Sequence, residues 1–153
     1  MSIQYRRAGI SDLDNLVAIR VKVLKAANLL PDNADLSEVE SESRDYYSHS
    51  LADGSHIAYL VYDGDKIVGA GGMSLYRVLP TCHNPSGRKA YIMNMYTDPD
   101  YRRRGIGRKL LDLLVQAVRE EGISYISLEA TEMGRPLYEK YGFIPLENEM
   151  YLL

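Results

Sequence analysis

A short basic segment is the part of the sequence whose residue types and spacing point most directly to chemistry. It runs from Arg102 to Lys109 and places five of the chain's 18 lysine and arginine residues within eight positions. Gly105 and Gly107 lack a Cβ atom, so backbone amides at the start of a following helix can approach an oxyanion directly. The positive end of the helix dipole favours the same charge. The segment therefore predicts a phosphate or pyrophosphate site. The alternative is a solvated basic turn whose glycines serve only the bend.

Two common nucleotide-binding patterns do not fit this segment. A P-loop requires Gly-x-x-x-x-Gly-Lys-Ser/Thr, whereas Gly107 is followed by Arg108, Lys109 and Leu110. A dinucleotide fingerprint requires a third glycine, and that position holds Leu110. The phosphate site therefore belongs to neither class.

The strands that must position this segment are predicted from apolar patterns and turn residues. His56–Tyr62 and Lys66–Val78 flank Asp63-Gly64-Asp65 and predict a β-hairpin. Inside the hairpin, Gly69-Ala70-Gly71-Gly72 predicts a bulge or a site of close packing. Further strands or extended segments are expected at Ile3–Arg7, at Tyr91–Thr97, at Ser124–Ala130 and from Phe143 onward.

The helix between Gly105 and Gly122 is the strongest secondary-structure prediction in the sequence. Its apolar residues recur at helical spacing: Leu110, Leu111, Leu114, Val115 and Val118. Strands on both sides make this region a βαβ unit, whose strands are parallel and whose ligands bind at the carboxyl end of the first strand. That place is Thr97 to Gly107.

Three other helices are expected. Ser11, with Asp14 three residues later, predicts the cap of a helix that ends near Asn28. After a polar stretch, Leu30–Ser43, a short helix contains Tyr46, Tyr47 and Leu51. The last helix is Arg135–Tyr141, with Pro136 in its first turn and Gly142 at its end.

Composition limits the class of protein. The chain has 153 residues, a net charge of -3, 13 tyrosines, one phenylalanine and no tryptophan. The length fits one domain, and the charge gives no reason to expect binding to nucleic acid or to an anionic membrane. Its one cysteine, Cys82, excludes an internal disulfide, and no stretch is long and apolar enough for a membrane span. A soluble, cytoplasmic protein is therefore expected, as a monomer or a homodimer.

Two spaced motifs resemble those of the GNAT superfamily of N-acetyltransferases. Arg102-x-x-Gly105-x-Gly107 matches its acyl-CoA signature, Arg/Gln-x-x-Gly-x-Gly/Ala, and the string from Leu137 to Phe143 is similar to its Leu-Tyr-Glu-Lys-x-Gly-Phe segment. The resemblance implies one N-acetyltransferase domain over residues 1–153. The implied fold is α/β of the α+β type, with a mixed, mostly antiparallel sheet and helices on both faces. Its parallel fourth and fifth strands splay apart to form the acyl-CoA cleft.

The resemblance also implies acetyl-CoA as co-substrate, without a metal. Backbone groups of Met95, Tyr96 and Thr97 would pair with its pantetheine arm. The pyrophosphate would be held by the basic segment, chiefly through its amides: Arg102, Arg103, Arg104, Gly105, Ile106, Gly107 and Arg108.

Amine acetylation needs an acid for the departing thiolate and a base for the amine. Tyr138 matches the family tyrosine that commonly acts as the acid, and Glu129 is the first candidate for the base. Glu129 shares a strand face with Ser127 and Thr131. The alternatives are a packing tyrosine and a solvated carboxylate. His83, His49 and His56 are weaker candidates for the base.

The sequence departs from the family pattern in two places. Thr131 and Gly134 stand where many members carry Asn and Ala, which puts a side-chain amide contact to the pantetheine in doubt. The end of the chain, Phe143 to Leu153, is short for the two final strands of the family, so one strand and a bend are expected there.

The acceptor is expected to be a small-molecule or peptide amine. Six carboxylates in residues 32–45 suggest a cationic acceptor; the alternative is a solvated acidic loop. Transfer would occur in a ternary complex, because Cys82 has no evident activating partner for an acyl-enzyme. Two other functions stay open: a non-catalytic acyl-CoA-binding sensor or interaction domain, and RNA binding through the arginines, against which the mild overall acidity argues.

Overall fold

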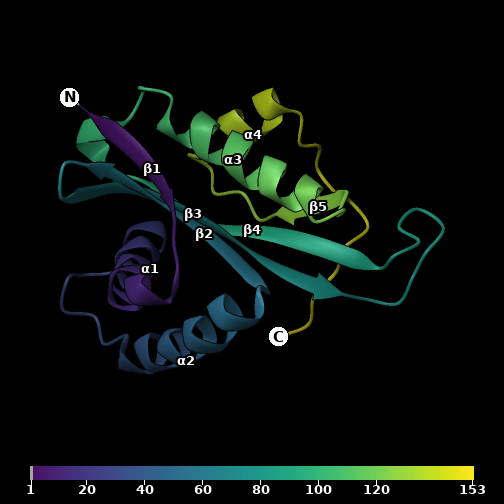
Figure 1. Ribbon diagram of the computed structural model, residues 1–153, viewed down its shortest axis with the longest axis horizontal. Coiled ribbons are helices and arrows are strands. Elements are labelled where there is room, and N and C mark those ends of the chain that lie inside the picture. The colour runs from purple at the N-terminus through teal and green to yellow at the C-terminus, as the bar shows by residue number, and fades with distance from the viewer. Residues whose placement is uncertain (1) are drawn as a thin grey trace.

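A mixed five-stranded sheet forms the centre of the computed structural model, which describes residues 2–153 (Figure 1). The strands lie side by side in chain order: β1 (Ile3–Arg7), β2 (His56–Asp63), β3 (Lys66–Arg77), β4 (Arg88–Thr97) and β5 (Tyr125–Leu128). The first four pair antiparallel, and β4 pairs parallel with β5. The mixed, mostly antiparallel sheet and its parallel last pair are therefore confirmed. Met1, the first residue of the expected domain, lies outside the described residues.

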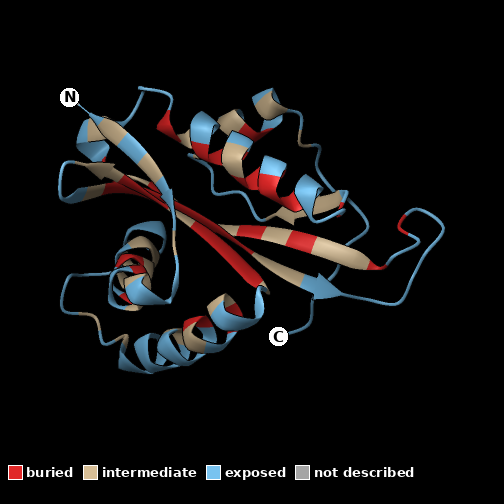
Figure 2. Cartoon of the chain, viewed as in Figure 1, coloured by how far each residue is buried: buried red, intermediate tan, exposed pale blue. Residues whose placement is uncertain are grey.

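Helices cover both faces of the sheet. On one face are α1 (Leu13–Ala27) and α2 (Ser37–Asp53), and on the other are α3 (Ile106–Glu120) and α4 (Arg135–Tyr141) (Figure 1). Both faces of the sheet must be covered by helices, because the apolar side chains of β2 alternate between the two faces. Ala58 and Leu60 pack with α1, whereas Ile57 packs with α3. Buried residues accordingly run along the middle strands and the inner faces of the helices (Figure 2).

The helix predicted after Gly105 is confirmed as α3. Leu110, Leu111, Leu114 and Val118 are fully buried on its inner face. This spacing gives one apolar stripe that packs on the sheet, and it holds the start of α3 at the end of β4.

A bulge in β4 separates the strand into two parts. Gly72 pairs with Met93 and Ala70 pairs with Tyr96, so Asn94 and Met95 together oppose Gly71. The backbone of Asn94 is left-handed, with a φ of +62°. A Cβ on Gly71 would lie 2.8 Å from the Met95 sulfur. The close packing expected at the glycine run is thus present, whereas the extra residue of this bulge lies in β4, opposite Gly71, rather than within the run.

β5 follows β4 only along its first part. The last paired residues are Ile92 and Leu128, just before the bulge. The second part of β4, through Thr97, extends beyond this pairing and remains bonded to β3 alone. The splay between the fourth and fifth strands is therefore confirmed.

Three local predictions were wrong. The helix α2 begins at Ser37, inside the polar stretch expected to precede it, because Glu38 and Glu40 place negative charge in the first turn, where the helix dipole favours it. Ser11 does not cap α1; instead the Asp12 carboxylate accepts the Gly9 amide at 2.8 Å, within a short 3₁₀ turn at Ile10–Asp12. Residues 143–153 form no strand.

Within residues 2–153, no helix is long and apolar enough to cross a membrane. No group of three or more histidine, cysteine, aspartate or glutamate residues there is arranged to hold a metal ion.

The burial of α3 predicts a large stability effect of truncation. Leu114→Ala should lower the free energy of unfolding by about 2–5 kcal/mol, because a fully buried leucine loses its contacts and leaves a cavity. Urea unfolding followed by circular dichroism measures it. Leu79→Ala is the matched control: Leu79 is 86% exposed, and its truncation should change stability by less than about 0.5 kcal/mol. Equal effects would contradict the packing described for α3.

Candidate active site

The second part of β4 offers an unpaired edge. The Asp98 amide donates to the Val68 carbonyl at 2.8 Å, so Asp98 faces β3, and Tyr96 pairs with Ala70 in the same direction. Because main-chain groups alternate in direction along an antiparallel pair, the N–H and C=O of Thr97 face away from β3. They point toward the side on which β5 would lie if its pairing with β4 continued beyond Ile92. A ligand can pair with this edge as an added strand does.

The side chains of Met95 and Tyr96 are packed into opposite faces of the sheet. Tyr96 is 9% exposed and lies in the cluster beneath α1. Met95 packs on the α3 side, against Gly71. Met95 therefore has only main-chain groups to offer to a ligand in the splay, whereas the main-chain groups of Tyr96 face β3.

The basic segment folds into a turn that presents backbone amides. After the 3₁₀ turn Pro99–Tyr101, the backbone is left-handed at Arg103, with a φ of +64°, and again at Gly105, with a φ of +82°. The first bond of α3 is from the Lys109 amide to the Gly105 carbonyl, at 3.0 Å. The amides of the first turn have no partner within the helix, and they lie at the positive end of its dipole. This arrangement can bind a phosphate or pyrophosphate.

Two arginines of the turn contact its own backbone. The Arg102 Nε lies 3.4 Å from the Thr97 carbonyl oxygen. The Arg104 guanidinium donates to the Asp100 carbonyl at 3.0 Å and stacks over the Tyr101 ring, 4.9 Å from its centroid. Both side chains therefore stay near the loop and add positive charge beside it.

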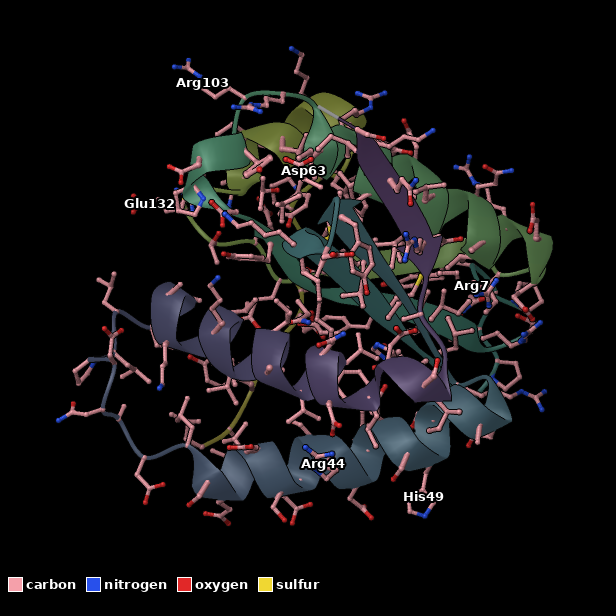
Figure 3. All side chains as sticks on the ribbon, turned by 60° about the vertical axis from the view of Figure 1, so that its left-hand side comes forward. Arg7, Arg44, His49, Asp63, Arg103 and Glu132 are labelled. Atoms are coloured by element: carbon pink, nitrogen blue, oxygen red, sulfur yellow. The ribbon has the colours of Figure 1, made fainter. Side chains whose placement is uncertain are left out.

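The other two arginines point elsewhere. Arg108 extends along α3, 3.7 Å from the Asp112 carboxylate and 4.5 Å from the centroid of the Tyr141 ring. Arg103 projects outward from the turn (Figure 3). Within the turn, Arg108 therefore contributes through its amide rather than through its guanidinium.

Tyr138 lies on α4, beside the start of α3. Its side chain is 9% exposed, and burial raises the pKa of its hydroxyl. Its ring makes an edge contact with Phe143 at 6.0 Å. The neighbouring Leu137 packs against Gly107, where a Cβ would lie only 2.9 Å from its methyl group. The glycine thus serves the contact between α3 and α4 as well as the turn.

Thr131 and Gly134, which stand where many members of the family carry Asn and Ala, have local roles. The Thr131 hydroxyl accepts the Gly134 amide at 3.1 Å and so closes the turn before α4. A Cβ on Gly134 would lie 3.0 Å from a ring carbon of Tyr138. The absence of a side chain at this position therefore leaves room for the Tyr138 ring.

Glu129 and Tyr138 line the same cleft. This cleft has a volume of about 1120 Å³ and lies between β5, α4 and the C-terminal segment. Glu129 is exposed just beyond β5, and its carboxylate accepts a hydrogen bond from Tyr91 at 3.4 Å. Burial, and secondly the Glu129 charge, raise the pKa of Tyr91. Residues of the basic turn do not line this cleft.

Sequence reasoning missed a polar cluster beneath α1 and α2. His56 is 6% exposed, and its Nδ1 lies 2.8 Å from the Tyr46 hydroxyl, which also contacts the Ser74 hydroxyl at 2.6 Å. On α1, Arg20 donates to the side-chain oxygen of Asn94 at 3.3 Å. These residues come from five elements and share no local pattern, so no signal in the sequence would have found them.

The remaining histidines and the acidic segment lie at the surface. His49 is on the outer side of α2, beside Asp45 (Figure 3). His83 is exposed in the loop after β3. Asp35 accepts the Ser37 amide at 3.0 Å at the start of α2. Asp35, Glu38 and Glu40 thus stand near a helix N-terminus, where negative charge is stabilising.

The sequence of this chain is similar to those of known acetyltransferases. The model of the acetyltransferase (GNAT) family matches residues 25–143. Among curated relatives, a glucosamine 6-phosphate N-acetyltransferase from Trypanosoma brucei brucei is 30% identical over 90 residues, 46% of this chain and 61% of the relative. A ribosomal protein bS18-alanine N-acetyltransferase from Escherichia coli is 36% identical over 58 residues, 36% of this chain and 39% of the relative. The chain thus spans less than two thirds of either relative.

Two solved structures are similar over almost the whole chain. A predicted acetyltransferase from Clostridium acetobutylicum, crystallised with acetyl-CoA, has a TM-score of 0.92 and 33% identity, covering 99% of this chain and 96% of its own. A GCN5-related N-acetyltransferase from Ralstonia eutropha has a TM-score of 0.86 and 29% identity, covering 99% of each chain.

The environment of His56 predicts how it titrates. Burial, assisted by the positive charge of Arg20, lowers its pKa to about 4. In the unfolded chain the pKa returns to about 6.5, so the unfolded state binds more protons between these values and stability falls as the pH drops from about 6.5 to about 4. We expect the His56 resonances in NMR spectra to show no titration above pH 5. A midpoint near 6.5 would contradict the buried, neutral imidazole.

Proposed function

The chain belongs to the GNAT acetyltransferase family, and from this premise we propose that it is an acetyl-CoA-dependent N-acetyltransferase acting on a primary amine. The observation that carries the proposal is the path from the strand edge at Thr97, which no other strand pairs and whose carbonyl accepts from Arg102, to the amides at the start of α3, which have no partner within the helix. A strand edge suits an amide-containing arm, and a helix N-terminus suits a pyrophosphate. Coenzyme A carries both groups, one after the other.

The donor would be held mainly by main-chain groups. Met95 and Thr97 lie along the splayed part of β4, and Thr97 turns its N–H and C=O away from β3. The amides of Gly105, Ile106, Gly107 and Arg108 would bind the pyrophosphate, and the guanidiniums of Arg102, Arg103 and Arg104 would add positive charge around it. The Ile106 side chain is buried, so it anchors the loop and leaves only its amide for the ligand.

The chemical step requires one proton donor and one proton acceptor. When bound, acetyl-CoA supplies an activated thioester. The Tyr138 hydroxyl, kept neutral by burial, would donate its proton to the departing thiolate. Glu129 would accept the proton that the acceptor ammonium must lose, in the same cleft.

The path of transfer is direct in this proposal. Cys82 is exposed in the loop between β3 and β4, outside the residues that line the cleft, so an acyl-enzyme has no suitable nucleophile there. We treat residues 1–153 as one N-acetyltransferase domain. A reducing, cytoplasmic location suits its single cysteine.

The acceptor is an amine of a small molecule or a peptide. The relatives named above include enzymes for an amino-sugar phosphate and for a protein alanine, which span both kinds. The cleft beside β5 adds tyrosine rings and carboxylates, among them Tyr91 and Glu129, that suit an ammonium group. A cationic acceptor would bind there rather than at the acidic segment of α2, whose carboxylates lie at a helix start.

Backbone strain at Gly105, in the basic turn, provides a test of acetyl-CoA binding. Gly105→Ala should weaken acetyl-CoA binding about tenfold, because a side chain at a φ of +82° costs about 1–2 kcal/mol and shifts the amides. Isothermal titration calorimetry with acetyl-CoA measures the dissociation constant.

Gly54→Ala is the matched control. Gly54 has a φ of +80° at the end of α2, and neither glycine has a neighbouring atom within 4 Å of an added Cβ. The backbone strain is therefore the same, and affinity should be unchanged. If both variants bind acetyl-CoA as tightly as the parent, the turn does not hold the donor.

The two proton-transfer roles are tested by removing each group. Tyr138→Phe and Glu129→Gln should each lower kcat about 10²–10⁴-fold while leaving the dissociation constant of acetyl-CoA unchanged. Thiol release from acetyl-CoA is measured with a panel of amines. Tyr125→Phe, in the same cleft, controls for loss of a tyrosine hydroxyl and should keep full activity.

Each result has a distinct meaning. A Tyr138→Phe variant as active as the parent would remove Tyr138 from the acid role. Acetyl-CoA binding by the parent, without thiol release for any amine, would favour a non-catalytic acyl-CoA sensor.

A further inference from the structure

Arg20 is a half-buried cation without a carboxylate partner among residues 2–153. Six ion pairs join described side chains, and none of them includes Arg20. Its hydrogen bond goes to the neutral side-chain oxygen of Asn94, at 3.3 Å. A guanidinium has five N–H donors, so most of them remain available to a ligand.

The groups that face Arg20 from the neighbouring elements are neutral at pH 7. His56, at the start of β2, has a pKa lowered to about 4, first by burial and then by the Arg20 charge. Tyr47, on α2, has a pKa raised to about 12 by burial, against the opposing effect of Arg20. Asn94 supplies an amide from β4. Nothing described in this environment neutralises the guanidinium.

The position of Arg20 is fixed at the point where the sheet opens. Asn94 forms the bulge of β4, and its left-handed backbone, with a φ of +62°, is one that asparagine tolerates better than most residues. The Asn94 side chain lies on the α1 side of the sheet, because it contacts Arg20. The guanidinium is therefore held beside the bulge, on the face opposite α3.

We propose that Arg20 binds an anionic group, a carboxylate or a phosphate, of the acceptor whose amine is acetylated. A planar guanidinium matches both anions through paired hydrogen bonds. This inference rests on the proposed N-acetyltransferase function and adds a substrate class to it: an amine that also carries a carboxylate or a phosphate.

The distance along β4 fits such an acceptor. Tyr91, which binds Glu129, and Asn94, which binds Arg20, are three positions apart, or about 10 Å along a strand. Ser74 lies on the same surface: it pairs with Tyr91, and its hydroxyl contacts the sulfur of Met93, the residue before Asn94, at 3.9 Å. The ammonium would be received near Glu129 and the anion near Arg20.

Matched amines test the inference. The first pair is glucosamine 6-phosphate and glucosamine, and the second is L-lysine and L-lysinamide; each pair differs in one anionic group. We expect kcat/KM to be about 10- to 100-fold higher for the anionic member of at least one pair. A preference in the first pair alone identifies a phosphate, and one in the second alone a carboxylate. Equal rates within both pairs would overturn the inference.

Substitutions assign the preference to Arg20. Arg20→Gln should abolish it by raising KM for the anionic member and leaving the neutral member unchanged, and Arg20→Lys should restore part of it. Arg44→Gln, on α2, is the matched control, since Arg44 pairs with Asp14 at the surface. If Arg20→Gln slows both members equally, Arg20 only supports the bulge, and the inference fails.

Binding separates this inference from the proposed function. If no amine releases thiol, the function fails, but calorimetric titration of the same four compounds into the parent and Arg20→Gln proteins still decides the anion site. A preference for the anionic member that is lost in Arg20→Gln supports it. Absence of any preference overturns it.

Discussion

The bulge at Asn94 and Met95 is the constraint on which the rest of the structure depends. It inserts one residue opposite Gly71, and β5 stops pairing with β4 just before it, after Ile92 and Leu128. Two strands that diverge in this way leave main-chain groups unpaired, and an unpaired edge inside a protein needs a ligand or water. The same divergence brings the end of β4 to the start of α3. The bulge thus sets both the edge of β4 that β5 leaves unpaired and the direction in which the chain enters the basic turn.

Small residues allow side chains to pack closely against the sheet beside this bulge. Gly71 leaves space for the Met95 sulfur on the α3 side, and Gly72 leaves space for the His56 ring on the other side, where a Cβ would lie 2.8 Å from Nε2. Gly107 and Gly134 do the same for Leu137 and Tyr138 near α4. Several glycines of the chain are therefore required by close contacts of side chains around the site, in addition to glycines with a positive φ such as Gly54 and Gly105.

Charge is distributed between the two faces of the sheet in a manner that suits two substrates. The basic turn and the start of α3 form a positive site at one end of the splay, where phosphates would bind. On the α1 side, Arg20 stands among neutral groups, and Glu129 lies farther along beside Tyr91. Tyrosine hydroxyls connect these positions: Tyr46 contacts His56 and Ser74, and Tyr91 contacts Glu129. The surplus of tyrosine over phenylalanine thus provides polar contacts at the edges of an apolar core.

The sequence by itself indicated most of the elements and the basic turn. The apolar spacing of α3, the hairpin around Asp63-Gly64-Asp65, and the Arg102-x-x-Gly105-x-Gly107 motif are local patterns, and each depends on residues within one or two turns of chain. Only the tertiary structure decided which edge of β4 is free, that Arg108 points away along α3, and that Glu129 and Tyr138 share a cleft. Only the tertiary structure brings Arg20 into hydrogen-bond contact with Asn94, 74 residues away in the sequence. Such contacts arise from the packing of α1 on a bulged strand, and a bulge shifts the facing of every later residue in a way that no local pattern records.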